Sequence, residues 1–98
     1  MALPSGLSTL DLVRITGSSH ATVEAWADGS EQPSGIAASR LADVEEVLAV
    51  LERVGMSDPQ ARADWLRNPH PTFGRVAPID VIARDAHYDV VALIETFS

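Results

Sequence analysis

Residues 36–54 read I-A-A-S-R-L-A-D-V-E-E-V-L-A-V-L-E-R-V and form the longest stretch with a helical period in the chain. Leu41, Val44, Leu48 and Leu51 recur three and four residues apart, the spacing that places side chains on one face of an α-helix. The charged residues fall mostly on the other faces. At about 1.5 Å per residue the stretch spans nearly 30 Å. It therefore predicts one long amphipathic helix with a buried side.

The preceding segment carries the start and stop signals of two short helices. Ser8 can cap a helix over residues 9–15 that Gly17 ends, and Ser19 can cap a second helix over residues 20–27. No alternation of apolar and polar residues, as in a half-buried strand, extends beyond a few positions. We therefore expect an all-α fold: a small helical domain with an N-terminal helix-turn-helix, a long central helix and further helices at the C-terminal end.

Residues 65–97 read W-L-R-N-P-H-P-T-F-G-R-V-A-P-I-D-V-I-A-R-D-A-H-Y-D-V-V-A-L-I-E-T-F, with punctuation that divides them into short elements. Prolines and a glycine between positions 69 and 74 predict a rigid loop. Pro78 can begin a short helix, because a proline in the first turn removes no needed hydrogen bond. A break near Asp85 precedes a last helix that is expected to end at Phe97.

The order Trp-Leu, Asn-Pro, Gly, Pro-Ile-Asp-Val-Ile and Tyr-Asp-Val-Val-Ala-Leu-Ile within this stretch resembles the toxin-binding domain of the Xre/MbcA/ParS family of bacterial antitoxins. Arg75 and Asp85-Ala86 stand where many family members have glycine. Alanine at position 86 implies that the left-handed turn there is absent or strained.

Residues 9–28 resemble the helix-turn-helix of Xre-type and MerR-type regulators, with Gly17 at the turn and with Val23 and Trp26 holding the second helix on the first. The two resemblances imply three parts. These are a helix-turn-helix-like segment at 1–35, a central helix at 36–55 and a toxin-binding domain at 56–98.

Antitoxins of this family neutralise RES-domain toxins, which consume NAD⁺, by docking their C-terminal helices over the active-site cleft. The resemblance thus implies a type II antitoxin whose partner is a cognate RES-domain toxin, assembled as a homodimer or as a hetero-oligomer with the toxin. Because Ser98 follows so soon after the last helix, we expect the helix face rather than an extended tail to block the toxin. The expected contacts are the polar and aromatic positions Arg75, Arg84, Tyr88, Glu95 and Phe97.

Operator DNA is a second partner to consider, through Ser18, Ser19, His20 and Thr22, whose side chains can donate hydrogen bonds. However, residues 19–28 contain two carboxylates and neither arginine nor lysine, whereas DNA-reading helices normally carry cations. Two interpretations stay open: a helix that binds the operator and autoregulates the operon, or a degenerate helix-turn-helix kept for packing or dimerisation. A stand-alone transcriptional regulator is the alternative function.

Length and composition limit the remaining classes. Ninety-eight residues with 46% hydrophobic side chains suit one small globular domain. A net charge of −7 disfavours binding to phosphate backbones and favours a basic protein partner, although acidity can also serve solubility alone. The chain has no cysteine, no run that could span a membrane and no signal peptide. We therefore expect a cytoplasmic protein without membrane contact.

Candidate catalytic chemistry is sparse. His20, His70 and His87 are scattered, lack the spacing of metal ligands and are expected on the surface or in loops. No nucleophile and base stand in a recognisable arrangement, so we expect no enzymatic activity, no cofactor and no metal. Trp65 could anchor an interface, but packing beneath the neighbouring prolines is favoured. The small alanines of the 36–55 helix could form a dimer surface, but an intramolecular core is favoured there.

Overall fold

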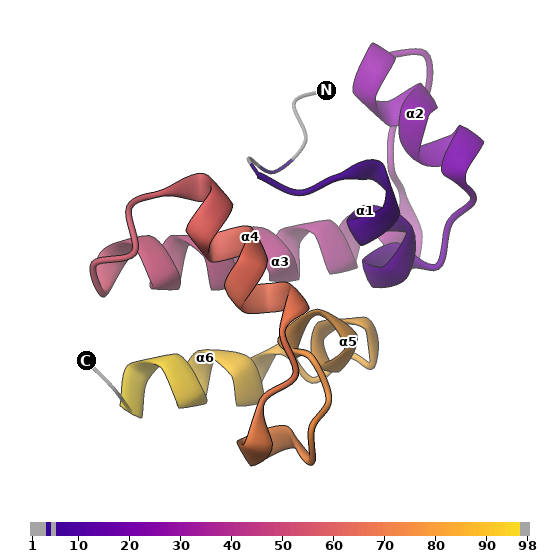
Figure 1. Ribbon diagram of the computed structural model, residues 1–98. Coiled ribbons are helices and arrows are strands. Elements are labelled where there is room, and N and C mark those ends of the chain that lie inside the picture. The colour runs from indigo at the N-terminus through magenta and orange to yellow at the C-terminus, as the bar shows by residue number, and fades with distance from the viewer. Residues whose placement is uncertain (1–3, 5, 97–98) are drawn as a thin grey trace.

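The computed structural model describes residue 4 and residues 6–96, and these fold into six α-helices and one short 3-10 helix (Figure 1). The all-α prediction is confirmed, because the described residues contain no strand and only an isolated bridge between His70 and Val76. The elements are α1 (Thr9–Thr16), α2 (His20–Asp28), α3 (Gly35–Arg53), α4 (Pro59–Arg67), η1 (Pro71–Phe73), α5 (Pro78–Ala83) and α6 (His87–Thr96).

The local signals in the sequence account for where the helices begin. Ser8 and Asp11 form a reciprocal capping box at α1, in which each side chain accepts a hydrogen bond from the other residue's backbone N–H. The Ser19 hydroxyl caps α2 by accepting from the backbone N–H of Thr22. Proline opens α4, η1 and α5, as expected for a residue that loses nothing in a first turn.

The helices α3 and α5 end with the same hydrogen-bond pattern. The left-handed residue after the helix is glycine in the first case and aspartate in the second. After α3, Gly55 and Met56 donate to carbonyls of the last turn. After α5, Asp85 (φ 64°) donates to the carbonyl of Ile82, and Ala86 donates to that of Val81. Alanine at position 86 predicts a left-handed turn that is absent or strained; the turn is present, and Asp85, which tolerates this conformation better than most residues, adopts it in place of Ala86.

The buried face of α3 organises the core. It contacts α1, α4, α5 and α6, whereas α2 packs mainly on α1 and extends from one end of the molecule (Figure 1). The small alanines of α3 are not among its buried residues, because Ala42 is exposed and Ala37 and Ala38 are only half-buried, so the dimer interpretation of their face stays a prediction. One cluster of buried side chains joins residues from all three predicted segments, such as Leu12, Leu51 and Ile79. The α3 residues in it are Leu41, Val44, Val47, Leu48, Val50 and Leu51.

His87 corrects one sequence-based expectation, because it is buried and not on the surface. It begins α6 and lies against α3, where its Nε2 is 2.8 Å from a carboxylate oxygen of Glu46 and its Nδ1 is 3.5 Å from one of Asp43. The helical period alone could not reveal this, because the carboxylates that receive the ring are more than 40 positions away in the sequence.

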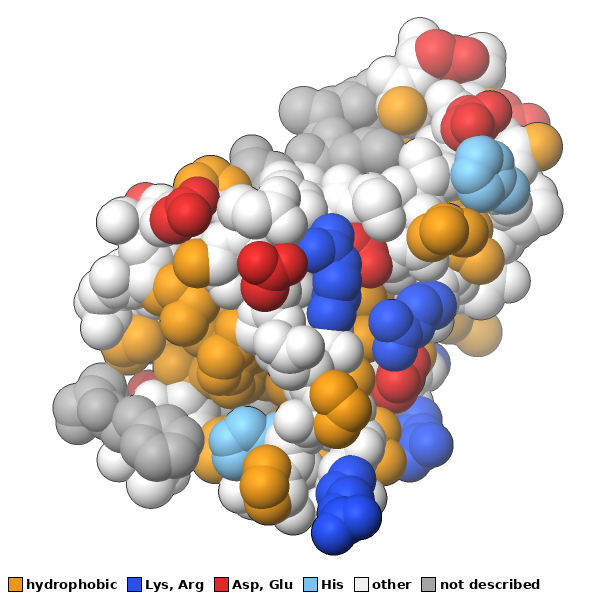
Figure 2. Space-filling view, viewed as in Figure 1, with side chains coloured by type: hydrophobic (Ala, Val, Ile, Leu, Met, Phe, Trp, Pro, Cys, Tyr) orange, Lys and Arg blue, Asp and Glu red, His pale blue; other side chains and the backbone are white. Residues whose placement is uncertain are grey.

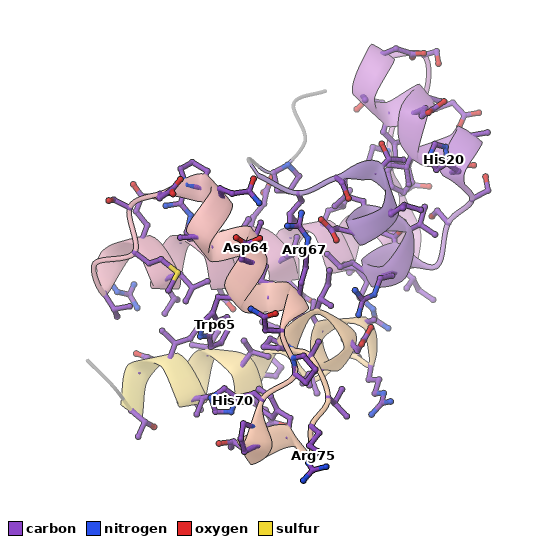
Figure 3. All side chains as sticks on the ribbon, viewed as in Figure 1. His20, Asp64, Trp65, Arg67, His70 and Arg75 are labelled. Carbon is purple, nitrogen blue, oxygen red and sulfur yellow. The ribbon has the colours of Figure 1, made fainter. Side chains whose placement is uncertain are left out.

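An ion pair fastens the start of α1 to the end of α4. The guanidinium Nε of Arg67 donates to both carboxylate oxygens of Asp11, at 3.1 and 3.0 Å. The same guanidinium also bonds Asp64 and the carbonyl oxygen of Gly6, and Figure 3 shows Asp64 and Arg67 along α4. Burial alone would raise the pKa of Asp11, but hydrogen bonds from Arg67 and Ser8 outweigh burial and hold this pKa below its usual value.

Asp11→Asn should keep a carbonyl oxygen for the capping box but lose the ion pair, and so lower the free energy of unfolding by about 2 kcal/mol at pH 7. A lowered folded-state pKa means that the carboxylate contributes fully above about pH 4 and that the contribution is lost as the pH falls through the folded-state value. Urea unfolding between pH 7 and pH 2 should show the difference from wild type shrinking below about pH 4. The exposed Asp64→Asn is the control, with an expected loss under about 0.5 kcal/mol; equal losses would contradict the assignment.

Gly6 meets α4 so closely that any side chain would collide. A Cβ atom there would lie 2.4 Å from the carbonyl oxygen of Pro59, and φ is +86°. Gly6→Ala should therefore lower the free energy of unfolding by at least about 2 kcal/mol. Gly29→Ala is matched in φ (+85°) but meets no atom within 4 Å, so it should cost only about 1 kcal/mol. Chemical denaturation of both variants checks the difference, and a Gly6 variant no worse than the Gly29 variant would refute the contact.

Candidate protein-interaction surface

The outward face of α6 is well exposed. Tyr88 keeps 72% of its surface accessible, which is unusual for a large apolar ring. Glu95 lies seven residues further along, on the same side of the helix, and its carboxylate is 3.9 Å from the guanidinium of Arg53 at the end of α3. Ala92 is also exposed between them. The helix therefore presents an exposed aromatic ring and, further along the same side, Ala92 and the carboxylate of Glu95, which is paired with Arg53.

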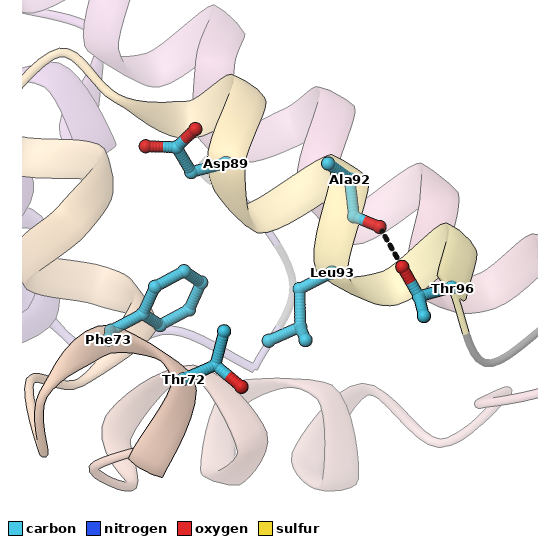
Figure 4. A pocket seen from close by; sticks show the side chains of 6 residues that line it. All are labelled: Thr72, Phe73, Asp89, Ala92, Leu93 and Thr96. Carbon is cyan, nitrogen blue, oxygen red and sulfur yellow. Dashed lines mark hydrogen bonds between the residues drawn. The ribbon is translucent and has the colours of Figure 1, made fainter.

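A shallow groove of about 580 Å³ separates α6 from η1 (Figure 4). The α6 wall consists of side chains three, four and seven residues apart, and Phe73 faces it from η1. The Thr96 hydroxyl donates to the carbonyl of Ala92, 2.8 Å away, which leaves the wall mostly apolar. The lining residues are Thr72, Phe73, Asp89, Ala92, Leu93 and Thr96.

The loop that carries η1 is held firmly by its own hydrogen bonds. The backbone N–H of His70 donates to the carbonyl of Val76 at 3.2 Å, and that of Arg75 donates back to the carbonyl of His70 at 3.1 Å. The His70 ring accepts from the backbone N–H of Thr72 and lies between the rings of Trp65 and Phe73, with centroids 6.4 and 5.9 Å away. The wall of the groove is thus anchored to α4.

Two arginines next to this surface have no ionic or hydrogen-bonding partner among the described residues, Arg75 after η1 and Arg84 after α5. Both are exposed. Four of the other five arginines donate to a carboxylate or to a backbone carbonyl, and the fifth, Arg53, forms only a long ion pair at 3.9 Å. Those five are Arg14 with Asp80, Arg40 with Asp85, Arg53 with Glu95, Arg62 with the carbonyl of Met56, and Arg67 with Asp11 and Asp64.

The four described residues that are predicted to contact a toxin are exposed at three different places in the chain's last third. Tyr88 and Glu95 share a face of α6, while Arg75 and Arg84 lie in the turns before and after α5. Phe97 lies outside the described residues. None of the four described residues lines the groove, which sequence reasoning missed. The spacing of positions 89, 92, 93 and 96 could have indicated a second α6 face, but nothing in the sequence shows that η1 stands opposite it.

Trp65 lies half-buried on α4, where apolar side chains gather between α4 and α6 (Figure 2). It helps line an almost wholly apolar slot of about 110 Å³ with Leu51, Val54, Met56 and Ile94. One side of the ring therefore packs against the core, and the rest remains accessible. Trp65 thus packs beside residues of α3 and α6, whereas packing beneath the neighbouring prolines is expected from the sequence, and its role as an interface anchor stays a prediction.

The polar residues of α2 are occupied by local bonds. Ser19 and Thr22 form a hydroxyl pair at 2.8 Å in addition to the cap, and His20 lies 3.3 Å from Glu24. The backbone N–H of Ser18 donates to the hydroxyl of Thr16. The helix carries no arginine or lysine, so an approaching phosphate would meet carboxylates first.

Other site classes find no support in the described part of the chain. No group of three or more histidine, aspartate or glutamate side chains there is arranged to hold a metal ion. None of the described helices combines the length and apolar character that a membrane span requires.

Comparison of the chain with protein-family models, with curated proteins and with solved structures finds no match.

The bonds of Ser19 predict a structural role that can be measured. Ser19→Ala should lower the free energy of unfolding by about 1 kcal/mol, because the first turn of α2 loses its cap. The neighbouring Ser18→Ala removes a hydroxyl for which the structure shows no bond and should change stability by less than about 0.5 kcal/mol. Thermal and urea unfolding of the two variants provide the comparison, and equal stabilities would contradict the capping role.

Proposed function

We propose that the chain is an antitoxin of a type II toxin–antitoxin pair, which binds and occludes an NAD-consuming RES-domain toxin. The observation that carries this proposal is the surface formed by α6 and the η1 loop. It combines an exposed aromatic ring, a mostly apolar groove and Arg75, which has no ionic or hydrogen-bonding partner among the described residues, and it falls within the segment that resembles the antitoxin family's toxin-binding domain. The same surface supports a binding role over an enzymatic one.

The surface suits a protein partner that places apolar side chains of a helix or a loop in the groove. Tyrosine and arginine are over-represented among the residues that contribute most to binding, because they combine large contact area with directed polar groups. Tyr88 supplies such a ring, and the groove beside Ala92 can receive apolar side chains. Blockade then follows from covering the toxin's cleft with the rigid α6 face, without any chemistry by the antitoxin.

A second candidate function is DNA binding, either alone or as autoregulation by the antitoxin. The feature that favours it is that α2 packs mainly on α1 and extends from one end of the molecule (Figure 1), where a second helix could reach a DNA groove. The absence of lysine and arginine from α2 weighs against it. A gel shift on the chain's own promoter at two salt concentrations separates a regulator, which should bind with steep salt dependence, from an antitoxin that acts on protein alone.

Co-expression tests the main proposal. A RES-domain protein encoded next to this chain should arrest growth when expressed alone, and the chain should rescue growth and co-purify with it. A neighbouring protein that is harmless alone and does not co-purify would remove the basis for the proposal.

Ala92→Arg places a long, charged side chain at the groove and should weaken toxin binding at least about tenfold, because it fills the space a partner would enter. Ala49→Arg introduces the same side chain at an exposed position of α3, away from the groove, and is the matched control. Both variants should keep a stability within about 0.5 kcal/mol of wild type, since exposed helix positions tolerate arginine. Calorimetry of each variant with the toxin measures the effect, and equal affinities would place the interface elsewhere.

A further inference from the structure

Two described residues other than glycine adopt left-handed backbone conformations, Asp85 (φ 64°) and Arg75 (φ 68°). Contacts within the fold explain why Asp85 adopts the left-handed conformation. Its backbone N–H closes the end of α5, and its carboxylate accepts from the guanidinium of Arg40 at 2.8 Å. Aspartate also tolerates this conformation better than most residues. Replacing it would therefore remove an ion pair.

Among the described residues, no contact of the Arg75 side chain explains why an arginine occupies this left-handed position. The backbone bonds between His70 and Arg75, and between His70 and Val76, impose the left-handed turn. Gly74, just before it, is left-handed as well, so a second glycine would fit this turn without strain. The arginine side chain nevertheless occupies the position without an ionic or hydrogen-bonding partner among the described residues. A strained residue with no local compensation is an observation from which function can be inferred.

The surroundings of Arg75 indicate what it would bind. Figure 3 shows its side chain at the tip of the η1 loop, pointing away from the body of the molecule. The chain as a whole carries a net charge of −7, and the two arginines that have no partner among the described residues, Arg75 and Arg84, follow η1 and α5. Guanidinium groups pair with carboxylates and phosphates in forked geometry. Nucleic-acid backbones are bound through many cations, which this acidic chain does not offer, so a carboxylate is the better match for these arginines.

We propose that the tip of the η1 loop is a carboxylate-binding contact, in which Arg75, with Arg84 as the second cation, binds an acidic segment of the partner protein. The inference rests on the proposed function for the location of the partner, and it adds the partner's chemistry. The left-handed backbone of Arg75 lowers the stability of the fold, and in return its guanidinium is held at the rim of the interaction surface.

Replacing Arg75 by glycine separates stability from binding. Arg75→Gly should raise the melting temperature by about 3 °C, because the strain disappears, and should weaken toxin binding about tenfold, because the guanidinium is lost. Asp85→Gly is the matched control at the other left-handed position and should not raise the melting temperature, because the ion pair with Arg40 is lost. Arg75→Lys should retain part of the affinity. A melting temperature that falls in Arg75→Gly, or an unchanged affinity, would overturn the proposal.

A second measurement does not depend on the toxin. In a low-salt NMR titration of the full chain with a hexaglutamate peptide, the side-chain Nε–H signals of Arg75 and Arg84 should shift, and those of Arg14 and Arg67, which pair with Asp80 and Asp11, should not. A wild-type chain that shows these shifts but binds no RES toxin would refute the proposed function while retaining the carboxylate contact. Uniform or absent shifts would overturn the inference, and so would stronger shifts of the same two signals with a 20-base-pair DNA duplex.

Discussion

The structure depends on one constraint: none of its short helices can be stable without the apolar face of α3. Isolated helices of six to ten residues are marginal in water, so their stability must come from packing. The helix α3 supplies that packing to α1, α4, α5 and α6 because its buried positions cover a wide arc and not a narrow stripe. The opposite side of α3, with Ala42 and Glu45 exposed, takes no part in the core.

Polar contacts then select one arrangement of these helices. Hydrophobic packing alone tolerates several orientations of short helices, whereas a buried carboxylate requires a particular partner. Asp11 meets Arg67 only if the start of α1 reaches the end of α4, and His87 meets Glu46 only if α6 begins beside α3. These contacts place α6 with one face outward and bring η1 opposite it. The candidate interaction surface is therefore a consequence of how the core is specified.

Charge is distributed in a way that agrees with a binding role. Most arginines pair with carboxylates or backbone carbonyls of the fold. The two that have no partner among the described residues flank α5 in the last third of the chain. The N-terminal helices α1 and α2 pack on each other and are joined by a short turn after Gly17, but α2 has neither lysine nor arginine. The distribution of charge therefore disfavours α2 as a contact for phosphates. It favours the last third of the chain as the region that contacts an acidic protein segment.

The sequence by itself determined the helices, because caps, prolines and apolar spacing act over three to five residues. Ser8, Ser19 and Pro78 begin helices where expected, and the buried face of α3 was readable from its period. It also predicted Arg75, Arg84, Tyr88 and Glu95 as contact residues, and all four are exposed. Only the tertiary structure decided that His87 is buried, that Asp85 adopts the left-handed turn, and that η1 forms a groove with α6. The burial of His87 and the groove join residues that are far apart in the chain. The conformation of Asp85 depends on how the neighbouring helix ends, and no local sequence pattern encodes any of the three.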